Sequence, residues 1–306
     1  MSLIPQRRKE TVVTNEIELI AGYWTIAGDV YPSGPTEVSP FPFRERVEAA
    51  ARAGYKGMGL LNEDVQATAE KIGHPEMKRI LDANGIKHVQ LEFIIDWFRE
   101  GERRRKSDQY RRQILSAASA LGAREVKIGP GLGEDVEHPR PDELIADVPR
   151  MAEAFAGLCR DAAEHGTAIV LEFLPFGNVS KLETARAIVE AAGEPNGSLL
   201  VDIWHMARGG NDYNDIAKLP ARFIGAVELN DADEQVVGTL FNDSTHHRRL
   251  PGEGALNPPA FIKAVQAAGY RGPWGVELIS RAHRKLPLDE MARRSFETTM
   301  AQFKSV

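Results

Sequence analysis

Short apolar runs alternate with longer amphipathic segments along most of the chain. Runs such as Gly57 to Leu61 and Ala168 to Leu171 are continuously apolar, which is typical of strands buried on both faces. The segments between such runs, for example Phe43 to Ala53, carry apolar side chains at helical spacing and stop at a glycine. The pattern therefore predicts strands that alternate with helices.

Eight strands and eight helices are predicted in this way. The strands are Glu18 to Ile26, Gly57 to Leu61, His88 to Ile94, Glu125 to Gly129, Ala168 to Glu172, Leu199 to Asp202, Ile224 to Glu228 and Trp274 to Leu278. The helices are Phe43 to Ala53, Asn62 to Asn84, Asp108 to Leu121, Asp142 to His165, Leu182 to Ala192, Asp212 to Leu219, Pro258 to Ala268 and Leu288 to Phe303. Strands joined by helices predict an α/β fold with parallel strands, and eight such units close a single-domain (β/α)₈ barrel, which takes about 250 residues.

Four of the predicted strands end in a carboxylate. The acids are Glu172, Asp202, Glu228 and Glu277. A charged side chain in a core is strongly disfavoured unless the strand end opens on a polar site. Alternation along each strand places the acids on the face that would line the interior of a barrel. A doubly wound sheet is the alternative fold, but it would hold the four acids far apart, so their convergence favours the barrel.

Four carboxylates at one mouth repel one another unless a cation neutralises them. An all-oxygen ligand set suits a hard divalent ion. We therefore expect one divalent metal ion, Mn²⁺ or Mg²⁺ in the first place and Zn²⁺ or Co²⁺ as alternatives. For any one of the acids, a helix N-cap or an arginine partner is an alternative role.

Several further side chains lie at or near predicted strand ends. His205 follows Asp202 by three residues and is expected to contact a ligand carboxylate or the substrate. Arg208 and the segment from His246 to Glu253, with Arg248, are expected to bind substrate, because loops on this face of a barrel form the pocket.

Three other strands supply candidate substrate-binding residues. Lys127 is placed to polarise a carbonyl, Glu92 lies near the end of another strand, and Trp24 is placed to stack on a sugar ring, although packing explains Trp24 as well. The basic run from Arg99 to Arg112 predicts a solvated helix face or a contact between subunits of a homo-oligomer.

Composition narrows the class of protein. A hydrophobic fraction of 42% with 27% charged residues is typical of soluble globular chains, and the net charge of -6 argues against binding nucleic acid. No run is long and apolar enough to cross a membrane, and Cys159 is the only cysteine, so we expect a cytoplasmic protein that acts on small molecules. Residues 1–14 are expected to form an exposed tail and residues 15–306 the barrel.

The segments that carry these residues resemble the xylose isomerase-like TIM-barrel superfamily, often labelled sugar phosphate isomerase/epimerase. They are LEF with Glu172, VDIWHMARGG with Asp202 and His205, VELNDAD with Glu228, RLPGEG with Glu253, and GVELIS with Glu277. The resemblance implies one divalent metal site at the positions of the four acids. It also implies that Glu172 and Glu277 move protons at the substrate carbon, as in ketose epimerases.

One position departs from the pattern. Glu228 stands where epimerases of the superfamily carry histidine and the related 3-dehydroshikimate dehydratases carry glutamine. The HxxRGG and HHRRLPGEG segments are somewhat more similar to the dehydratases. The expected activity is therefore isomerisation or epimerisation of a polyhydroxy carbonyl compound, with a metal-dependent dehydratase as the main alternative. An endonuclease of the superfamily and a non-catalytic barrel are further alternatives.

Overall fold

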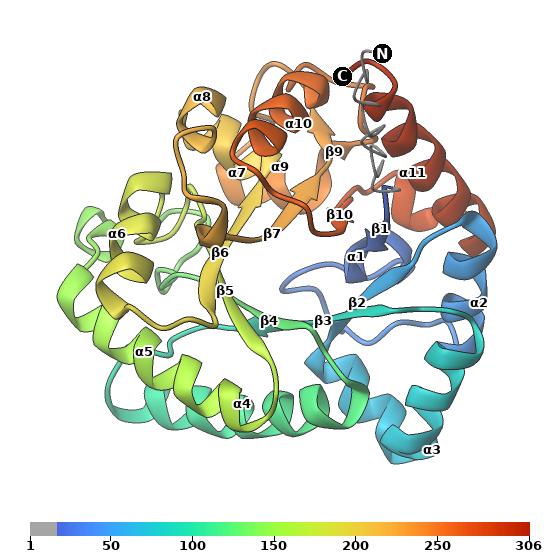
Figure 1. The fold of residues 1–306 in the computed structure, drawn as a ribbon, viewed down its shortest axis with the longest axis horizontal. Helices are drawn as coiled ribbons and strands as arrows, with labels where there is room; N and C mark the ends of the chain where they lie inside the picture. Colours follow the sequence, from blue (N-terminus) through green and yellow to red (C-terminus); the bar gives the residue numbers. More distant parts are fainter. Residues whose placement is uncertain (1–16) are drawn as a thin grey trace, which may run out of the picture.

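The computed structural model describes residues 17–306, and eight parallel strands in it form a closed barrel (Figure 1). They are β1 (Leu19–Ala21), β2 (Gly57–Leu61), β3 (His88–Ile94), β4 (Glu125–Ile128), β5 (Ala168–Glu172), β6 (Gly197–Asp202), β7 (Ile224–Leu229) and β10 (Trp274–Val276). Strand β1 pairs with both β2 and β10, so the sheet has no free edge. The predicted (β/α)₈ barrel is confirmed, whereas the tail expected at residues 1–14 lies outside the described residues.

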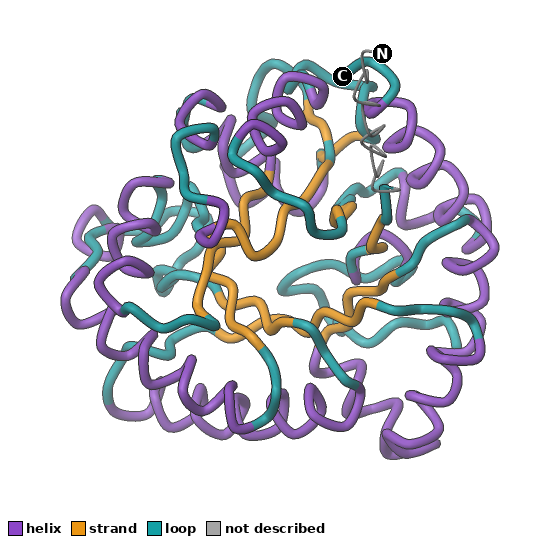
Figure 2. The backbone as a smooth tube through the Cα atoms, viewed as in Figure 1, coloured by secondary structure: helices purple, strands orange, loops and turns teal. Residues whose placement is uncertain are grey.

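Helices surround the strands on the outside of the barrel (Figure 2). The longer ones are α2 (Phe43–Ala53), α3 (Asn62–Ala83), α4 (Gly101–Leu121), α5 (Val148–Glu164), α6 (Leu182–Ala192), α10 (Pro258–Ala267) and α11 (Leu288–Phe303). Outward-facing strand residues such as Leu171 and Val201 belong to the large core between sheet and helices. Their neighbours Val170, Leu200 and Ala226 form a separate cluster, which the alternation of side chains places inside the barrel. No helix within residues 17–306 has the length and apolar character that a bilayer span requires.

Three short helices at the carboxyl ends of strands were not predicted. They are α1 (Tyr23–Ile26), α7 (Ile203–Arg208) and α9 (Leu240–His246). The first strand accordingly ends at Ala21, not at Ile26 as predicted, and Trp24 lies on a helix. The Asp202 side chain caps α7 by accepting a hydrogen bond from the His205 amide at 2.9 Å. These helices carry part of the wall at this end of the barrel.

Two predicted helix boundaries were also wrong. Helix α4 begins at Gly101 rather than Asp108, and the segment predicted as one helix from Asp142 divides into the 3₁₀ turn η1 (Pro141–Leu144) and α5. The remaining short elements are α8 (Tyr213–Ile216), the 3₁₀ turns η2 (Ala221–Phe223) and η3 (His283–Lys285), and a small antiparallel sheet of β8 (Asp231–Ala232) and β9 (Arg248–Arg249). This small sheet brings Arg248 back over the mouth of the barrel.

Candidate active site

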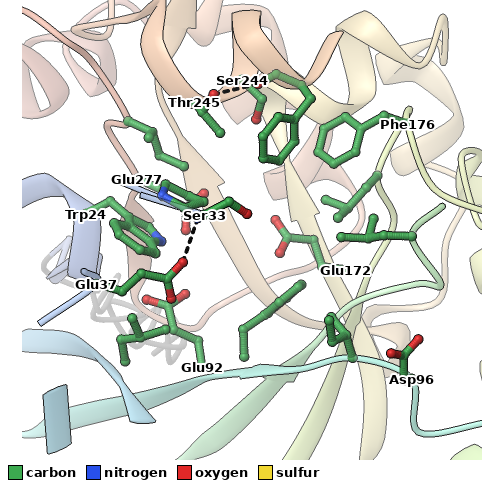
Figure 3. A pocket seen from close by; sticks show the side chains of 18 of the residues that line it. Trp24, Ser33, Glu37, Glu92, Asp96, Glu172, Phe176, Ser244, Thr245 and Glu277 are labelled. Carbon is green, nitrogen blue, oxygen red and sulfur yellow. Dashed lines mark hydrogen bonds between the residues drawn. The ribbon is translucent and has the colours of Figure 1, made fainter. Parts of the chain in front are cut away.

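A cavity of about 460 Å³ opens at the carboxyl ends of the strands. This volume is within the range of small-molecule sites. In Figure 3 the carboxylates of Glu92, Glu172 and Glu277 project toward its middle, and Trp24 and Phe176 lie on opposite walls. Apolar side chains supply much of the remaining wall, from Leu61, Phe93, Ile95, Leu132, Leu174, Phe241 and Ile279, and the charged side chains of Glu37, Glu63, Asp96, Arg103 and Lys106 also line it. The cavity thus combines apolar walls with an acidic floor.

Three of the predicted carboxylates converge here, Glu172 and Glu277 at the floor of the cavity and Glu228 fully buried next to them. Glu172 ends β5, Glu228 lies in β7, and Glu277 directly follows β10, and each offers an oxygen within 4.8 Å of the others. Strand pairing sets Glu228 beside Asp202 on one side and Gly275 on the other. The absence of a side chain at Gly275 leaves the space that Glu228 occupies, since a Cβ there would lie 2.7 Å from Glu228 Cγ.

Lys127 lies beneath the same cluster with no exposed surface. Its Nζ donates to Glu228 Oε1 in a short contact and to Glu92 Oε2 at 3.1 Å, and it is 3.5 Å from Glu277 Oε1. Lys127 is not among the residues that line the cavity, and its ammonium group lies among the carboxylates.

The fourth predicted ligand, Asp202, adjoins this cluster but is turned toward other partners. Its Oδ2 accepts from Asn230 at 2.7 Å and from Arg248 at 3.2 Å. The same Arg248 nitrogen donates to Glu277 Oε2 at 3.0 Å. Arg248 therefore links Asp202 to Glu277 and fixes both side chains.

The arrangement fits a divalent cation. Among the carboxylates of this cluster, three buried oxygens have no hydrogen-bond partner, namely Glu92 Oε1, Glu172 Oε1 and Glu228 Oε2. Buried acceptors without donors are rare because leaving them unpaired is costly. All the donors are carboxylate oxygens, which suit hard cations. Five carboxyl groups, those of Glu92, Glu172, Asp202, Glu228 and Glu277, also outnumber the two cations Lys127 and Arg248, so a divalent ion would reduce the excess negative charge.

The acids differ in how readily they ionise without such an ion. Burial, with repulsion from Glu277, raises the pKa of Glu172 to about 8. Burial, partly offset by Lys127, raises the pKa of Glu92 to about 7. Burial would also raise the pKa of Glu277, but Lys127 and Arg248 lower it on balance. Glu277 is thus the acid that the two cations hold ionised.

His205 is enclosed and neutral near pH 7, because burial lowers its pKa to about 4. It lines the cavity, with Nε2 3.1 Å from Glu172 Oε1 but not in hydrogen-bonding geometry. Its Nδ1 has no partner. His205 is therefore available to hydrogen-bond a ligand as a neutral ring.

Three predicted substrate contacts lie away from the cavity wall. Arg208 donates to Asp243 and to the backbone of residues 233–235, which holds that loop in place. His246 faces Arg284, and Glu253 is exposed and lies 3.6 Å from Arg294. None of the three belongs to the described cavity lining, whereas Trp24, Glu92 and Arg248 do. The bend of the chain through α9 and β9, which the sequence did not reveal, turns His246 and Glu253 outward.

Two residues that shape the site, Asn230 and Ser244, were not predicted from the sequence. Asn230 donates to Asp202, and Ser244 accepts from Arg248 through both its hydroxyl and its carbonyl oxygen. Each had a signal in the sequence. Asn230 is two residues beyond Glu228 and so continues the direction of its side chain, and Ser244 lies four residues before Arg248, although helix α9 ends between them at His246.

Residues 47–301 match the family described as xylose isomerase-like TIM barrel. The chain belongs to this family. It is 27% identical over 248 residues to a 3-dehydroshikimate dehydratase of Pseudomonas aeruginosa, which covers 79% of this chain but only 37% of that protein. It is 25% identical over 230 residues to an inosose isomerase of Halalkalibacterium halodurans, which covers 74% of this chain and 78% of that protein.

The fold is also that of a solved structure described as IolI protein with a bound zinc atom. The two superpose with a TM-score of 0.81 at 18% identity, over 94% of this chain and 99% of the other. The family is thus shared with enzymes of two reaction classes, an isomerase and a dehydratase. The chain spans little more than a third of the dehydratase, so the likeness concerns only part of that protein.

Proposed function

We propose that this chain is a divalent-metal-dependent isomerase or epimerase of a small polyhydroxy ketone, either a keto sugar or a keto-cyclitol. The observation that carries the proposal is the convergence of Glu172, Glu228 and Glu277, of which Glu172 and Glu277 line the cavity floor, with Glu172 Oε1 and Glu228 Oε2 left without a hydrogen-bond partner. Asp202 is proposed as the fourth ligand because it adjoins Glu228 and its Oδ1 bonds only the His205 amide. The ligand set favours Mn²⁺ or Mg²⁺, and the zinc of the IolI structure makes Zn²⁺ a candidate to test.

A bound divalent ion would polarise the substrate carbonyl and acidify the neighbouring C–H. Glu172 and Glu277 both reach the cavity, from β5 and from the end of β10. One carboxylate removes the proton from the carbon and the other returns a proton to the substrate. His205 hydrogen-bonds a substrate hydroxyl, and Trp24 and Phe176 exclude water from the two faces of the ring.

The two cations near the cavity floor, Lys127 and Arg248, are already paired with protein groups, and this favours an uncharged substrate. Lys127 is closed off from the cavity, and all three nitrogens of Arg248 already donate to protein groups. Neither is free to bind a carboxylate or a phosphate at the floor. The apolar walls suit the faces of a sugar or cyclitol ring, and the inosose isomerase relative agrees with such a substrate.

A metal-dependent dehydratase is the second candidate. It shares proton abstraction beside the carbonyl and then expels a β-hydroxyl instead of returning the proton. Its support is the Pseudomonas relative, together with Arg103 and Lys106, which line the cavity and carry the positive charge that a carboxylated ring would need. Arg103 is partly committed, however, because it donates to Asp96 at 2.8 Å.

The shared step has one test. The metal-loaded protein is incubated in D₂O with inososes, ketohexoses and 3-dehydroshikimate, and the products are analysed by mass spectrometry. We expect deuterium on carbon in an isomeric product from the isomerase reaction. Loss of water from 3-dehydroshikimate would instead identify the dehydratase. The Glu277→Gln and Glu172→Gln variants are the matched controls and should each lose the exchange. Metal-loaded protein that exchanges no carbon-bound hydrogen with any of these compounds would refute both reactions.

A further inference from the structure

A lysine among metal ligands is the unusual feature of this site. Lys127 is wholly enclosed, and its ammonium nitrogen donates hydrogen bonds to Glu228 and Glu92 and lies 3.5 Å from Glu277 Oε1. Two of these three partners belong to the carboxylate cluster that fits a cation. Lysine and metal would therefore share the oxygens of Glu228 and Glu277.

Substrate binding does not account for this lysine. The cavity lining includes Glu92, Glu172 and Glu277 but not Lys127, so a ligand in the cavity meets the carboxylates first. Ordinary packing does not account for it either, because an apolar side chain fills a barrel interior without burying a charge. The contacts of Lys127 therefore indicate that its role is to compensate the negative charge of the carboxylates.

We propose that Lys127 is a built-in counter-cation that competes with the divalent ion for the oxygens of Glu228 and Glu277. The ammonium stabilises the metal-free barrel, which would otherwise hold five carboxyl groups against Arg248 alone. The same positive charge repels an incoming divalent ion and so lowers its affinity. The charge of Lys127 also balances the negative charge of Glu228. A neutral residue at position 228, such as histidine or glutamine, would not need a lysine partner. This inference rests on the metal site of the proposed function.

The test is Mn²⁺ binding by isothermal titration calorimetry and thermal unfolding, with and without Mn²⁺, for the wild type, Lys127→Met and Lys127→Gln. Glutamine keeps a donor for the carboxylates, so it covers the case in which the methionine variant does not fold. In either variant Kd for Mn²⁺ should fall about tenfold or more, because one repelling charge is removed. The Tm of the metal-free variant should fall, and Mn²⁺ should raise Tm more than in the wild type.

Arg46→Met is the matched control. It breaks another enclosed ion pair, with Asp64, whose contacts include none of the five carboxylates. It should lower Tm and leave Kd for Mn²⁺ unchanged. Equal or weaker Mn²⁺ binding by a folded Lys127 variant would overturn the competition while leaving the metal site of the wild type intact. If neither the wild type nor the two variants bound Mn²⁺ or Zn²⁺, both the proposed metal site and this inference would be overturned. If only the variants bound the ion, the proposed competition would be supported.

Discussion

Arg248 shows how the interior of this site is held by a single side chain. Its Nη1 bridges Asp202 and Glu277, its Nη2 donates to Ser244 Oγ at 3.1 Å, and its Nε donates to the Ser244 carbonyl at 3.3 Å. Only 1% of the side chain is exposed. Its position in the sequence suggested a contact for an anionic substrate, and it does line the cavity, while its partners there are the two acids Asp202 and Glu277.

Replacing Arg248 by alanine should therefore act on stability. The change leaves Asp202 and Glu277 without their shared cation, and removing one partner of a buried ion pair costs about 3–5 kcal/mol. We expect the free energy of unfolding in urea to fall by about this amount, with Arg248→Lys intermediate because lysine keeps the charge but not the fork. Unchanged stability with a raised KM would instead make Arg248 a direct substrate contact.

At the scale of elements, the strands could be predicted and the short helices could not. A buried strand ending in an acid carries its own signal, because the apolar run and the charge conflict unless a site lies there. Helices α1, α7 and α9 span only four to seven residues, which is too short for a helical period to be recognised. The positions of these helices decide how the side chains of Trp24, His205 and His246 are oriented. These orientations could therefore not be predicted from the sequence.

Strand β10 shows how one strand shapes the position of a proposed metal ligand, Glu228, on its neighbour β7. A Cβ at Gly275 would lie 2.7 Å from Glu228 Cγ and 2.9 Å from the Val227 carbonyl oxygen. Gly275→Ala should destabilise the protein by about 1–3 kcal/mol, as overpacking does, and weaken Mn²⁺ binding by displacing Glu228. Urea unfolding and calorimetric titration measure the two effects.

Gly157→Ala is the control for that substitution. Gly157 lies within α5, and a Cβ there would meet nothing closer than Arg160 at 3.9 Å. Alanine should raise the unfolding free energy by about 0.5–1 kcal/mol through helix propensity and leave Mn²⁺ binding unchanged. If the Gly275→Ala variant bound Mn²⁺ as tightly as the wild type, the prediction would be wrong. Glu228 would then not be a metal ligand whose position depends on the space at Gly275.

At the scale of the molecule, the barrel follows from the number of strand and helix units, but the charge balance inside it does not. Lys127 and Glu228 are 101 residues apart in sequence and meet only because β4 and β7 face each other across a closed sheet. Four acids could be assigned to one mouth from their strand ends. Which of them would find a cation depends on side-chain directions that only the closed barrel fixes.

This charge balance makes the stability of the metal-free protein depend on pH. Glu172 and Glu92 have folded-state pKa values of about 8 and about 7, above the ordinary value of 4.5, so each favours folding at low pH and loses that contribution as pH rises through its folded pKa. His205 and His283 act in the opposite direction. Burial lowers the pKa of both to about 4, so each destabilises the fold as pH falls below 6.5. The two effects oppose each other below pH 6.5, and above it only the carboxyl groups still titrate.

The metal-free protein, kept in EDTA, should therefore lose about 2 kcal/mol of unfolding free energy between pH 6.5 and pH 8, since one pKa unit corresponds to about 1.4 kcal/mol. Saturating Mn²⁺ should reverse the slope, because ligand carboxylates must be deprotonated and metal binding strengthens as pH rises. Urea unfolding at the two pH values, with and without the ion, measures both slopes. Glu172→Gln removes one of the carboxyl groups whose pKa is raised and should make the metal-free profile shallower. Metal-free stability that rises toward pH 8 would mean that Glu172 and Glu92 are already ionised in the folded protein, and that the cations beside them compensate the cluster without a metal.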